Sequence, residues 1–233
     1  MKRRGFVQIC AASAAAGALP GAQGATQLTV RHFARARLVD EKGAPILLAR
    51  LQPGVSYVFD YPFAATPCFL LRLDRPAPGG ITLKTESGAP YTWEGGVGPG
   101  NAVVAYSAIC AHKMTYPTRQ VSFIGYRDAP SPVAGKGKVI TCCSDRSVYD
   151  PALGARVVSG PAPQPLATIL LEHDPASDEA SAVGTFGGDM FDAFFRKYEF
   201  RLQLEMGARA KAQVEATTVV RPLERYSSQW AQC

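Results

Sequence analysis

Histidine is scarce in this sequence, with three residues among 233. A site that needs several imidazole ligands is therefore restricted to positions 32, 112 and 173. His32 lies in a run of alternating apolar and polar residues, and His173 precedes a turn expected at Asp174 and Pro175. We interpret both as surface or packing residues, which leaves His112 as the one histidine available as a ligand.

Long apolar runs are also missing, apart from fourteen residues at 6–19, which is short for a helix that crosses a bilayer. Three basic residues at 2–4 precede this run, and the small residues Gly21, Ala22, Gly24 and Ala25 follow it, which is the pattern of an export signal. The paired arginines are typical of the twin-arginine route. We therefore predict a signal segment at 1–25 and a periplasmic protein, membrane-associated if the segment is retained.

Neither sign of charge dominates the chain. Loss of the signal segment would remove three basic residues and lower the formal net charge from +6 to +3. A basic domain that binds nucleic acid carries a much larger excess of lysine and arginine. The composition therefore gives no support for nucleic-acid binding, while an apolar content of 47% is enough to bury a core.

Cysteines are few, and five of the six lie beyond the predicted signal segment. An odd number in an exported protein is not explained by a simple disulfide framework. Cys68 lies in an apolar run and is expected to pack as a small hydrophobic residue. Cys233 is either a free thiol or paired with a partner. Cys110, Cys142 and Cys143 remain as candidate ligands.

Short alternating runs and intervening turns predict an all-β fold with antiparallel strands. Strands are expected at 28–33, 46–51, 55–59, 68–73, 103–109, 139–140, 154–158 and 167–172. Residues 190–198 predict one short helix with three phenylalanines on one side, and the alternation from Phe200 to Met206 predicts a further strand. Residues 208–233 are polar and predict a C-terminal tail.

Two short motifs carry the chemistry of this sequence. The first is Cys110-Ala111-His112, and the second, about thirty residues further on, runs from Cys142 through Cys143 and Ser144 to Asp145. Each follows a predicted strand, so each lies on a loop that a rigid sheet can hold. Ligands shared between two such loops suit a [2Fe-2S] cluster.

The region 103–170 resembles the Rieske domain. Besides Cys110, His112 and Cys142, the matching residues are Ser147, Tyr149 and the run from Gly154 to Pro163. The resemblance implies an antiparallel β-sandwich at 26–207, in which a small cluster-binding subdomain at 103–170 is inserted in a larger base.

The resemblance also implies a role for each matching residue. Cys110 and Cys142 would bind the buried iron of a [2Fe-2S] cluster, and His112 would bind the outer iron. The hydroxyls of Ser147 and Tyr149 would donate hydrogen bonds to a bridging sulfide and to a ligand sulfur. Residues 160–163, which include Gly160 and Pro161, match the proline-containing loop that covers the cluster.

The sequence departs from the Rieske pattern at the fourth ligand. Asp145 occupies the position of the second histidine, and a carboxylate brings a negative charge that should lower the reduction potential. Cys143 is the alternative ligand if the loop shifts by about two residues. The register of Ser147 and Tyr149 favours Asp145. Thr115 and Ser144 stand where the cytochrome bc group has two paired cysteines, and the longer spacing between the motifs predicts an insertion beside the cluster.

These patterns predict periplasmic one-electron transfer by a subunit or partner of a respiratory or periplasmic oxidoreductase. No catalytic nucleophile and base can be assembled, and loss of the second imidazole disfavours direct quinol oxidation. The expected partner is a redox protein such as a cytochrome or an oxidoreductase large subunit, with possible association with a membrane complex.

Two alternatives remain open: a zinc site, or a structural or assembly subunit without a cluster in which Cys142 and Cys143 are oxidised. The basic residues near the motifs are expected on a solvated face, where they can also steer an acidic partner: Lys113, Arg119, Arg127, Lys136 and Lys138.

Overall fold

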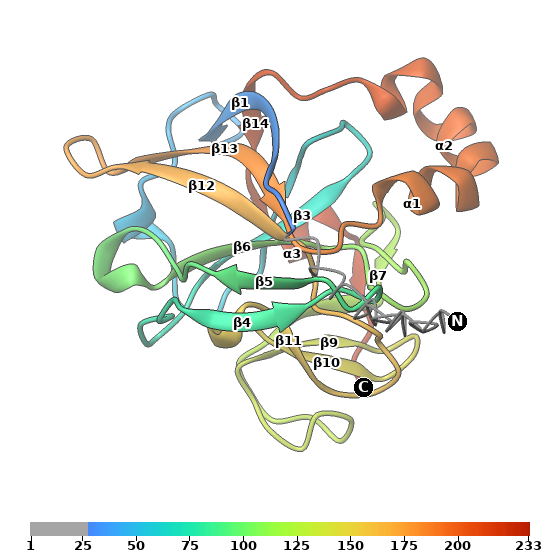
Figure 1. The fold of residues 1–233 in the computed structure, drawn as a ribbon. Helices are drawn as coiled ribbons and strands as arrows, with labels where there is room; N and C mark the ends of the chain where they lie inside the picture. The colour runs from blue at the N-terminus through green and yellow to red at the C-terminus, as the bar shows by residue number, and fades with distance from the viewer. Residues whose placement is uncertain (1–27) are drawn as a thin grey trace, which may run out of the picture.

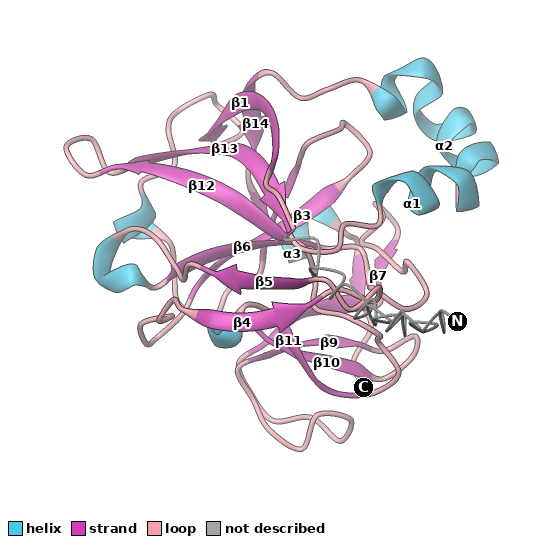
Figure 2. Cartoon of the chain, viewed as in Figure 1, coloured by secondary structure: helices cyan, strands magenta, loops and turns pink. Residues whose placement is uncertain are grey.

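The structure is a computed structural model and describes residues 28–233. The signal segment expected at 1–25 lies outside the described residues. Strands account for most of the regular structure, and the helices are short (Figures 1 and 2). The predicted all-β fold class is therefore confirmed.

The larger sheet has eight strands in the order β14-β1-β13-β12-β6-β3-β2-β15. Its neighbouring strands are antiparallel except β1 and β14, which are parallel. The strands are β1 (Arg31–Val39), β2 (Tyr57–Asp60), β3 (Pro67–Arg72), β6 (Val103–Ser107), β12 (Thr168–Asp174), β13 (Glu179–Phe186), β14 (Ala216–Val219) and β15 (Arg221–Pro222).

A second, antiparallel sheet has four strands in the order β11-β10-β9-β8. These are β8 (Ile124–Arg127), β9 (Val139–Cys142), β10 (Ser147–Asp150) and β11 (Arg156–Ser159). Two strand pairs complete the fold: β4 (Ile81–Lys84) with β5 (Pro90–Trp93), and β7 (Val121–Ser122) with β16 (Gln229–Trp230).

Apolar side chains cover both faces of the larger sheet. In β3, Phe69 and Leu71 point into one core cluster, whereas Cys68 and Leu70 point into another. Alternate residues of a strand point to opposite faces, so this continuous apolar run is that of a strand buried on both sides. The first cluster also contains Ile140, Tyr149 and other residues of the four-stranded sheet. It therefore joins that sheet to the larger one.

The predicted short helix is present as α1 (Phe191–Lys197), but the strand expected at 200–206 is wrong. These residues form α2 (Glu199–Met206), and a third short helix is α3 (Leu223–Tyr226). Leu202 is buried in α2 and packs with Tyr198 and Met206, while Phe200 and Leu204 are exposed. Residues four apart share a helix face, so the same alternation also describes a helix with one apolar side against the core.

Two further segments differ in detail from expectation. Residues 46–51, expected as a strand, contain the 3-10 helix η1 (Leu48–Arg50). The polar segment 208–233 adds β14, β15 and α3 to the fold and ends in β16, which pairs with β7.

None of the helices in residues 28–233 has the length and apolar character needed to cross a membrane.

Candidate metal centre

Two tight loops carry the predicted ligands. In the first site loop, residues 110–115, the Cys110 amide donates to Thr115 O at 2.8 Å and the Met114 amide to Cys110 O at 2.9 Å. In the second site loop, residues 142–147, Cys142 and Ser147 face each other at the ends of β9 and β10, and the Arg146 amide donates to Cys142 O at 2.8 Å. These backbone hydrogen bonds therefore fix the positions of the Cα atoms of Cys110 and Cys142.

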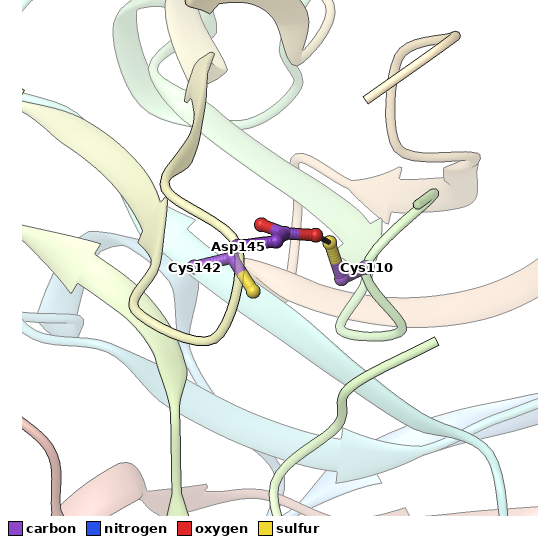
Figure 3. A group of neighbouring side chains, drawn as sticks. All are labelled: Cys110, Cys142 and Asp145. Carbon is purple, nitrogen blue, oxygen red and sulfur yellow. Dashed lines mark hydrogen bonds between the residues drawn. The ribbon is translucent and has the colours of Figure 1, made fainter. Parts of the chain in front are cut away.

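Three ligand side chains meet between these loops. The sulfurs of Cys110 and Cys142 and a carboxylate oxygen of Asp145 lie within 4.8 Å of one another (Figure 3). Both cysteines are buried and have free thiols. The Asp145 side chain is only 1% exposed, and its Oδ2 accepts a hydrogen bond from Cys110 Sγ at 3.2 Å. The structure thus brings three of the predicted ligands from the two motifs into one buried cluster.

His112 lies on the outer side of this cluster. Its Nδ1 is 3.1 Å from Asp145 Oδ2, and its side chain is 37% exposed. The imidazole and the carboxylate therefore stand side by side, with one edge of His112 open to solvent. The other two histidines are elsewhere: His32 is exposed in β1, and His173 Nε2 contacts Asp178 Oδ1 at 3.0 Å.

The two thiols differ in acidity because they contact each other. The hydrogen bond with Cys142 lowers the pKa of Cys110, and Tyr149 contributes to this lowering. The same contact, together with burial, raises the pKa of Cys142. A cation bound between the two sulfurs would displace their protons, since metals bind thiolates.

Asp145 remains ionised in spite of its position. Burial raises its pKa, but hydrogen bonds outweigh burial and hold the pKa below its usual range. The donors include the Ser147 amide, 2.9 Å from Oδ1, and the Cys110 thiol, 3.2 Å from Oδ2. A buried carboxylate that stays negative beside two thiols is an environment suited to a metal cation.

Tyr149 and Ser147 project from the same face of β10, because they are two residues apart. The Tyr149 hydroxyl lies 3.2 Å from Cys110 Sγ and accepts the Ala111 amide at 3.3 Å, so its own proton is available to the sulfur. Burial and the neighbouring Cys110 raise the pKa of Tyr149. The Ser147 hydroxyl is buried and has no hydrogen-bond partner among the described residues.

The segment 160–163 lies against the second site loop. Gly160 has a φ of +90°, and a Cβ there would stand 2.5 Å from both Arg146 O and Ser147 Cα. Only glycine allows this close approach of two backbones. Pro161, which follows, is exposed. Gly160 is therefore placed to pack over the loop that carries Asp145.

Cys143 is bonded to Cys233 and offers no free thiolate. The alternative in which Cys142 and Cys143 are oxidised together is therefore wrong in its pairing, since Cys142 is free. Cys233 pairs within the chain. Cys68 is buried in β3, where its sulfur donates to Tyr61 O at 2.9 Å, in keeping with a packing role.

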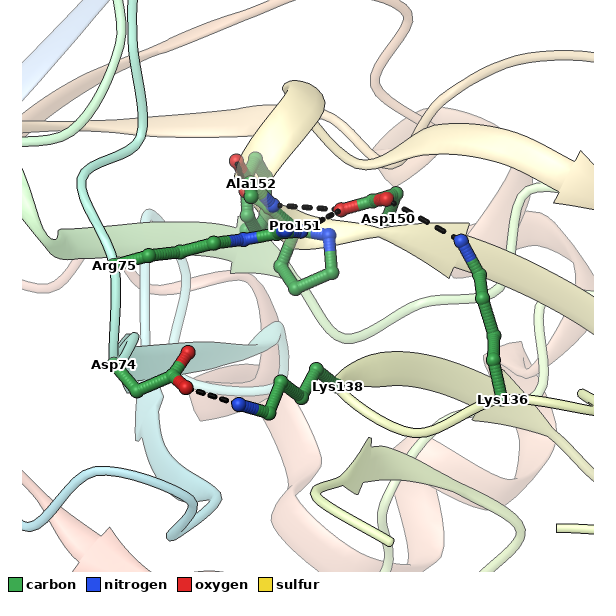
Figure 4. A network of polar contacts seen from close by, with 8 residues as sticks. Asp74, Arg75, Lys136, Lys138, Asp150, Pro151 and Ala152 are labelled. Carbon is green, nitrogen blue, oxygen red and sulfur yellow. Dashed lines mark hydrogen bonds and ion pairs between the residues drawn. The ribbon is translucent and has the colours of Figure 1, made fainter. Parts of the chain in front are cut away.

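The insertion between the two motifs, residues 128–138, joins β8 to β9 at the end of the sheet opposite the second site loop, because Arg127 pairs with Val139 and Ile124 with Cys142. The expectation of an insertion beside the cluster is therefore wrong, and the segment is held by the polar contacts shown in Figure 4. Lys136 Nζ is 3.5 Å from Oδ2 of Asp150, which follows Tyr149 in β10, and Lys138 pairs with Asp74. Asp150 also accepts the Ala152 amide at 3.1 Å. The Asp150-Pro151 pair is typical of a capped turn, so the sequence contained a signal for this anchor.

Arg127, expected on a solvated face, is buried with 7% exposure. Its guanidinium donates to Ala231 O at 2.5 Å and to Gln232 Oε1 at 3.0 Å, both near the C-terminus. No local pattern in the sequence indicates this contact, because its acceptors are about a hundred residues away.

The residues present fit an iron–sulfur group on three counts. Two buried thiols, an imidazole and a carboxylate form a mixed soft and hard donor set. The Tyr149 hydroxyl already contacts a ligand sulfur. The buried Ser147 hydroxyl lacks an acceptor within the described chain, which is costly unless a bound group accepts its proton.

No model of a known protein family matches this sequence. Among solved structures, the chain is similar to the soluble domain of the Rieske protein II (soxF) from Sulfolobus acidocaldarius, with 24% sequence identity and a TM-score of 0.46. The match covers 67% of this chain and 82% of that one.

Proposed function

We propose that this protein binds a [2Fe-2S] cluster and transfers single electrons. Cys110 and Cys142 would hold one iron, and His112 and Asp145 the other. The observation that carries the proposal is the meeting of two free buried thiols with Asp145 within 4.8 Å. Such a group of ligands, assembled from two loops and next to an exposed imidazole, suits the two irons of a [2Fe-2S] cluster.

When bound, the cluster would supply reversible one-electron chemistry. The residues of this chain set the conditions for it. The buried thiols keep water from the inner side, and the partly exposed His112 gives a short path to the surface. Tyr149 stabilises negative charge on Cys110 through its hydroxyl.

Asp145 would lower the reduction potential. A carboxylate adds one negative charge that a neutral imidazole does not, which makes reduction less favourable. We expect Asp145→His to raise the midpoint potential and Asp145→Asn to raise it by less or to weaken binding of the cluster. A potentiometric titration followed by EPR measures both. A lower potential in Asp145→His would contradict ligation by the carboxylate.

The proposed partner is a redox protein with an acidic surface, such as a cytochrome or an oxidoreductase large subunit, in the periplasm. Lys113 and Arg146 are exposed beside the two ligand motifs, and the segment 110–127 contains no acidic residue. Opposite charges accelerate encounter between redox partners. Fractionation of cells that express the full chain tests the location, and a cytoplasmic protein would contradict it.

The direct test is to purify the exported protein without oxygen and to measure iron, acid-labile sulfide and the EPR spectrum after reduction. We expect two irons and two sulfides per chain and a rhombic signal, as for a [2Fe-2S] cluster. Cys142→Ser should abolish the signal, whereas Cys68→Ala, at a buried free cysteine outside the site, should retain it. A colourless, iron-free wild-type protein would overturn the proposal.

A second candidate function is a structural site for one metal ion. The close approach of Cys110, Cys142 and Asp145 favours it, because ligands of a single tetrahedral zinc lie a few ångströms apart. The same purification distinguishes the two candidates: one zinc per chain and no sulfide indicates the structural site. Absence of any metal favours a structural or assembly subunit.

A further inference from the structure

The last seven residues, 227–233, form what we call the C-terminal strap. Its first part lies along residues 118–122, which follow the first site loop. The Ser227 hydroxyl donates to Thr118 O at 2.6 Å, and β16 pairs in parallel with β7. Three amides continue the contact: Ser228 to Arg119 O at 2.9 Å, Gln229 to Gln120 O at 3.1 Å and Ala231 to Ser122 O at 2.9 Å.

The far end of the strap is bonded to the second site loop. Cys233 forms a disulfide with Cys143, a neighbour of the candidate ligand Cys142. The Cys143 amide in turn donates to Phe123 O at 2.7 Å. One short segment therefore contacts the chain that leaves the first loop and is covalently joined to the second.

Arg127 fixes the middle of the strap. Its buried guanidinium lies 4.8 Å from the Trp230 ring centroid, donates to Ala231 O and Gln232 Oε1, and lies 3.4 Å from Cys143 Sγ. A Cβ at Gly125 would come within 2.9 Å of Trp230 Nε1, so the indole lies directly on the backbone of β8. Trp230 therefore packs against β8, while Ser228, Gln229 and Gln232 of the strap are exposed.

We propose that the C-terminal strap holds the two site loops in register, and that the Cys143–Cys233 disulfide makes the candidate metal centre sensitive to dithiol reductants. Positions 115 and 144, one in each loop, are threonine and serine. The two loops thus have no direct covalent link within the described chain. The strap connects them instead, through hydrogen bonds to residues 118–122 and the disulfide to Cys143.

The switching step is a thiol–disulfide exchange. A dithiol thiolate attacks the disulfide, a mixed disulfide forms, and a second thiolate closes the reductant into its own disulfide. Two electrons and two protons pass to Cys143 and Cys233, and the S–S bond breaks. Both residues are partly exposed, whereas Cys110 and Cys142 are buried, so a small reductant meets the disulfide first.

One of the two tests, the rate of metal loss, rests on the proposed function. The other, amide hydrogen exchange, does not depend on it. The first measurement is amide hydrogen exchange on metal-free full-length protein, with and without dithiothreitol. After reduction, we expect faster amide exchange in peptides that cover 110–122 and 142–149. The exchange rates of β12 and β13 should not change. The variant Cys233→Ser should show the fast pattern without reductant and no further response to it. Unchanged exchange in both would overturn the proposal.

The second measurement is the rate of metal or cluster loss to a chelator from the loaded protein. We expect at least tenfold faster loss from Cys233→Ser and from reduced wild type. Arg127→Met, which keeps the disulfide, should show intermediate rates, and Cys68→Ala should match the wild type. Equal rates in all four would overturn the proposal. If the protein binds no metal, the proposed function fails, and the exchange experiment still decides whether the strap orders the loops.

Discussion

The two loops that meet at the candidate metal centre are held by different means. The first site loop leads directly into an aromatic cluster, in which the Tyr116 ring lies 4.8 Å from Phe194 and 5.0 Å from Tyr198. Lys197 at the end of α1 also donates to Lys113 O at 2.5 Å. The second site loop lies in a polar setting, with hydrogen bonds to Asp145, the close approach of Gly160 and the disulfide to Cys233.

The difference shows two ways of making a loop rigid. Apolar packing by the helices α1 and α2 needs many buried side chains, and its stability depends on how well their shapes fit. A disulfide and a few buried hydrogen bonds need little apolar surface. Their contribution is lost when the disulfide is reduced or a hydrogen-bonding group is removed, rather than when the packing changes. We therefore expect mutations near the first loop to act through global stability, and those near the second to act locally at the site.

The largest expected effect comes from removing a ligand. This effect should be the same for a ligand of either loop. Cys110→Ser and Cys142→Ser should each eliminate binding of the metal or cluster, because a neutral hydroxyl does not replace a thiolate ligand. Metal analysis and visible absorption measure the loss. Retention of a full complement of iron in either variant would show that the loops do not share one site.

The next largest effect is expected at the helices α1 and α2, beside the first loop. Phe194→Ala should lower the free energy of unfolding by about 3–5 kcal/mol, because it empties a fully buried aromatic site. Phe200→Ala is the matched control, since Phe200 is 79% exposed in α2 and should change stability by less than about 0.5 kcal/mol. Denaturant unfolding measures both. Equal effects would mean that α2 does not pack as described.

A smaller effect on global stability is expected at the strap. Cys233→Ser should lower the free energy of unfolding by about 2–4 kcal/mol, the usual range for loss of one disulfide. At denaturant concentrations where the two variants have the same free energy of unfolding, Cys233→Ser should speed amide exchange in the second site loop more than Phe194→Ala does. Unfolding in denaturant together with exchange of the second loop separates the two contributions. A purely global response would remove the distinction drawn between the loops.

The smallest effect concerns Asp60, which lies next to the beginning of the strap. Its Oδ1 accepts from the Tyr226 hydroxyl at 3.3 Å, and burial raises its pKa to about 6. The folded state therefore binds a proton more tightly than the unfolded state, so this group stabilises the fold at low pH and its contribution is lost as pH rises from about 4 to about 6.

Asp60→Asn should remove this pH dependence, and the difference from the wild type should amount to about 1–3 kcal/mol. Urea unfolding of both proteins between pH 4 and pH 7 measures it. Parallel stability profiles would show that Asp60 is not buried in its charged form.

Much of the fold and of the candidate site followed from local patterns. Alternation of apolar residues predicted most strands, and strand ends predicted where Cys110 and Cys142 would lie. The exception at 200–206 has a clear cause. A period of two over seven residues contains pairs four apart, such as Leu202 and Met206, so the pattern alone does not separate strand from helix. Packing of Leu202 and Met206 in the neighbouring aromatic cluster favours the helix over the strand.

The sequence by itself determined the β framework and predicted the candidate ligands, because both depend on residue types at short spacing. Two cysteines, a histidine and an aspartate on loops after strands suffice to predict a metal centre. Only the tertiary structure decided that Cys143 pairs with Cys233 and that Arg127 is buried under Trp230. Those contacts join residues about ninety to a hundred positions apart, and such pairings depend on how the sheets pack rather than on any local pattern.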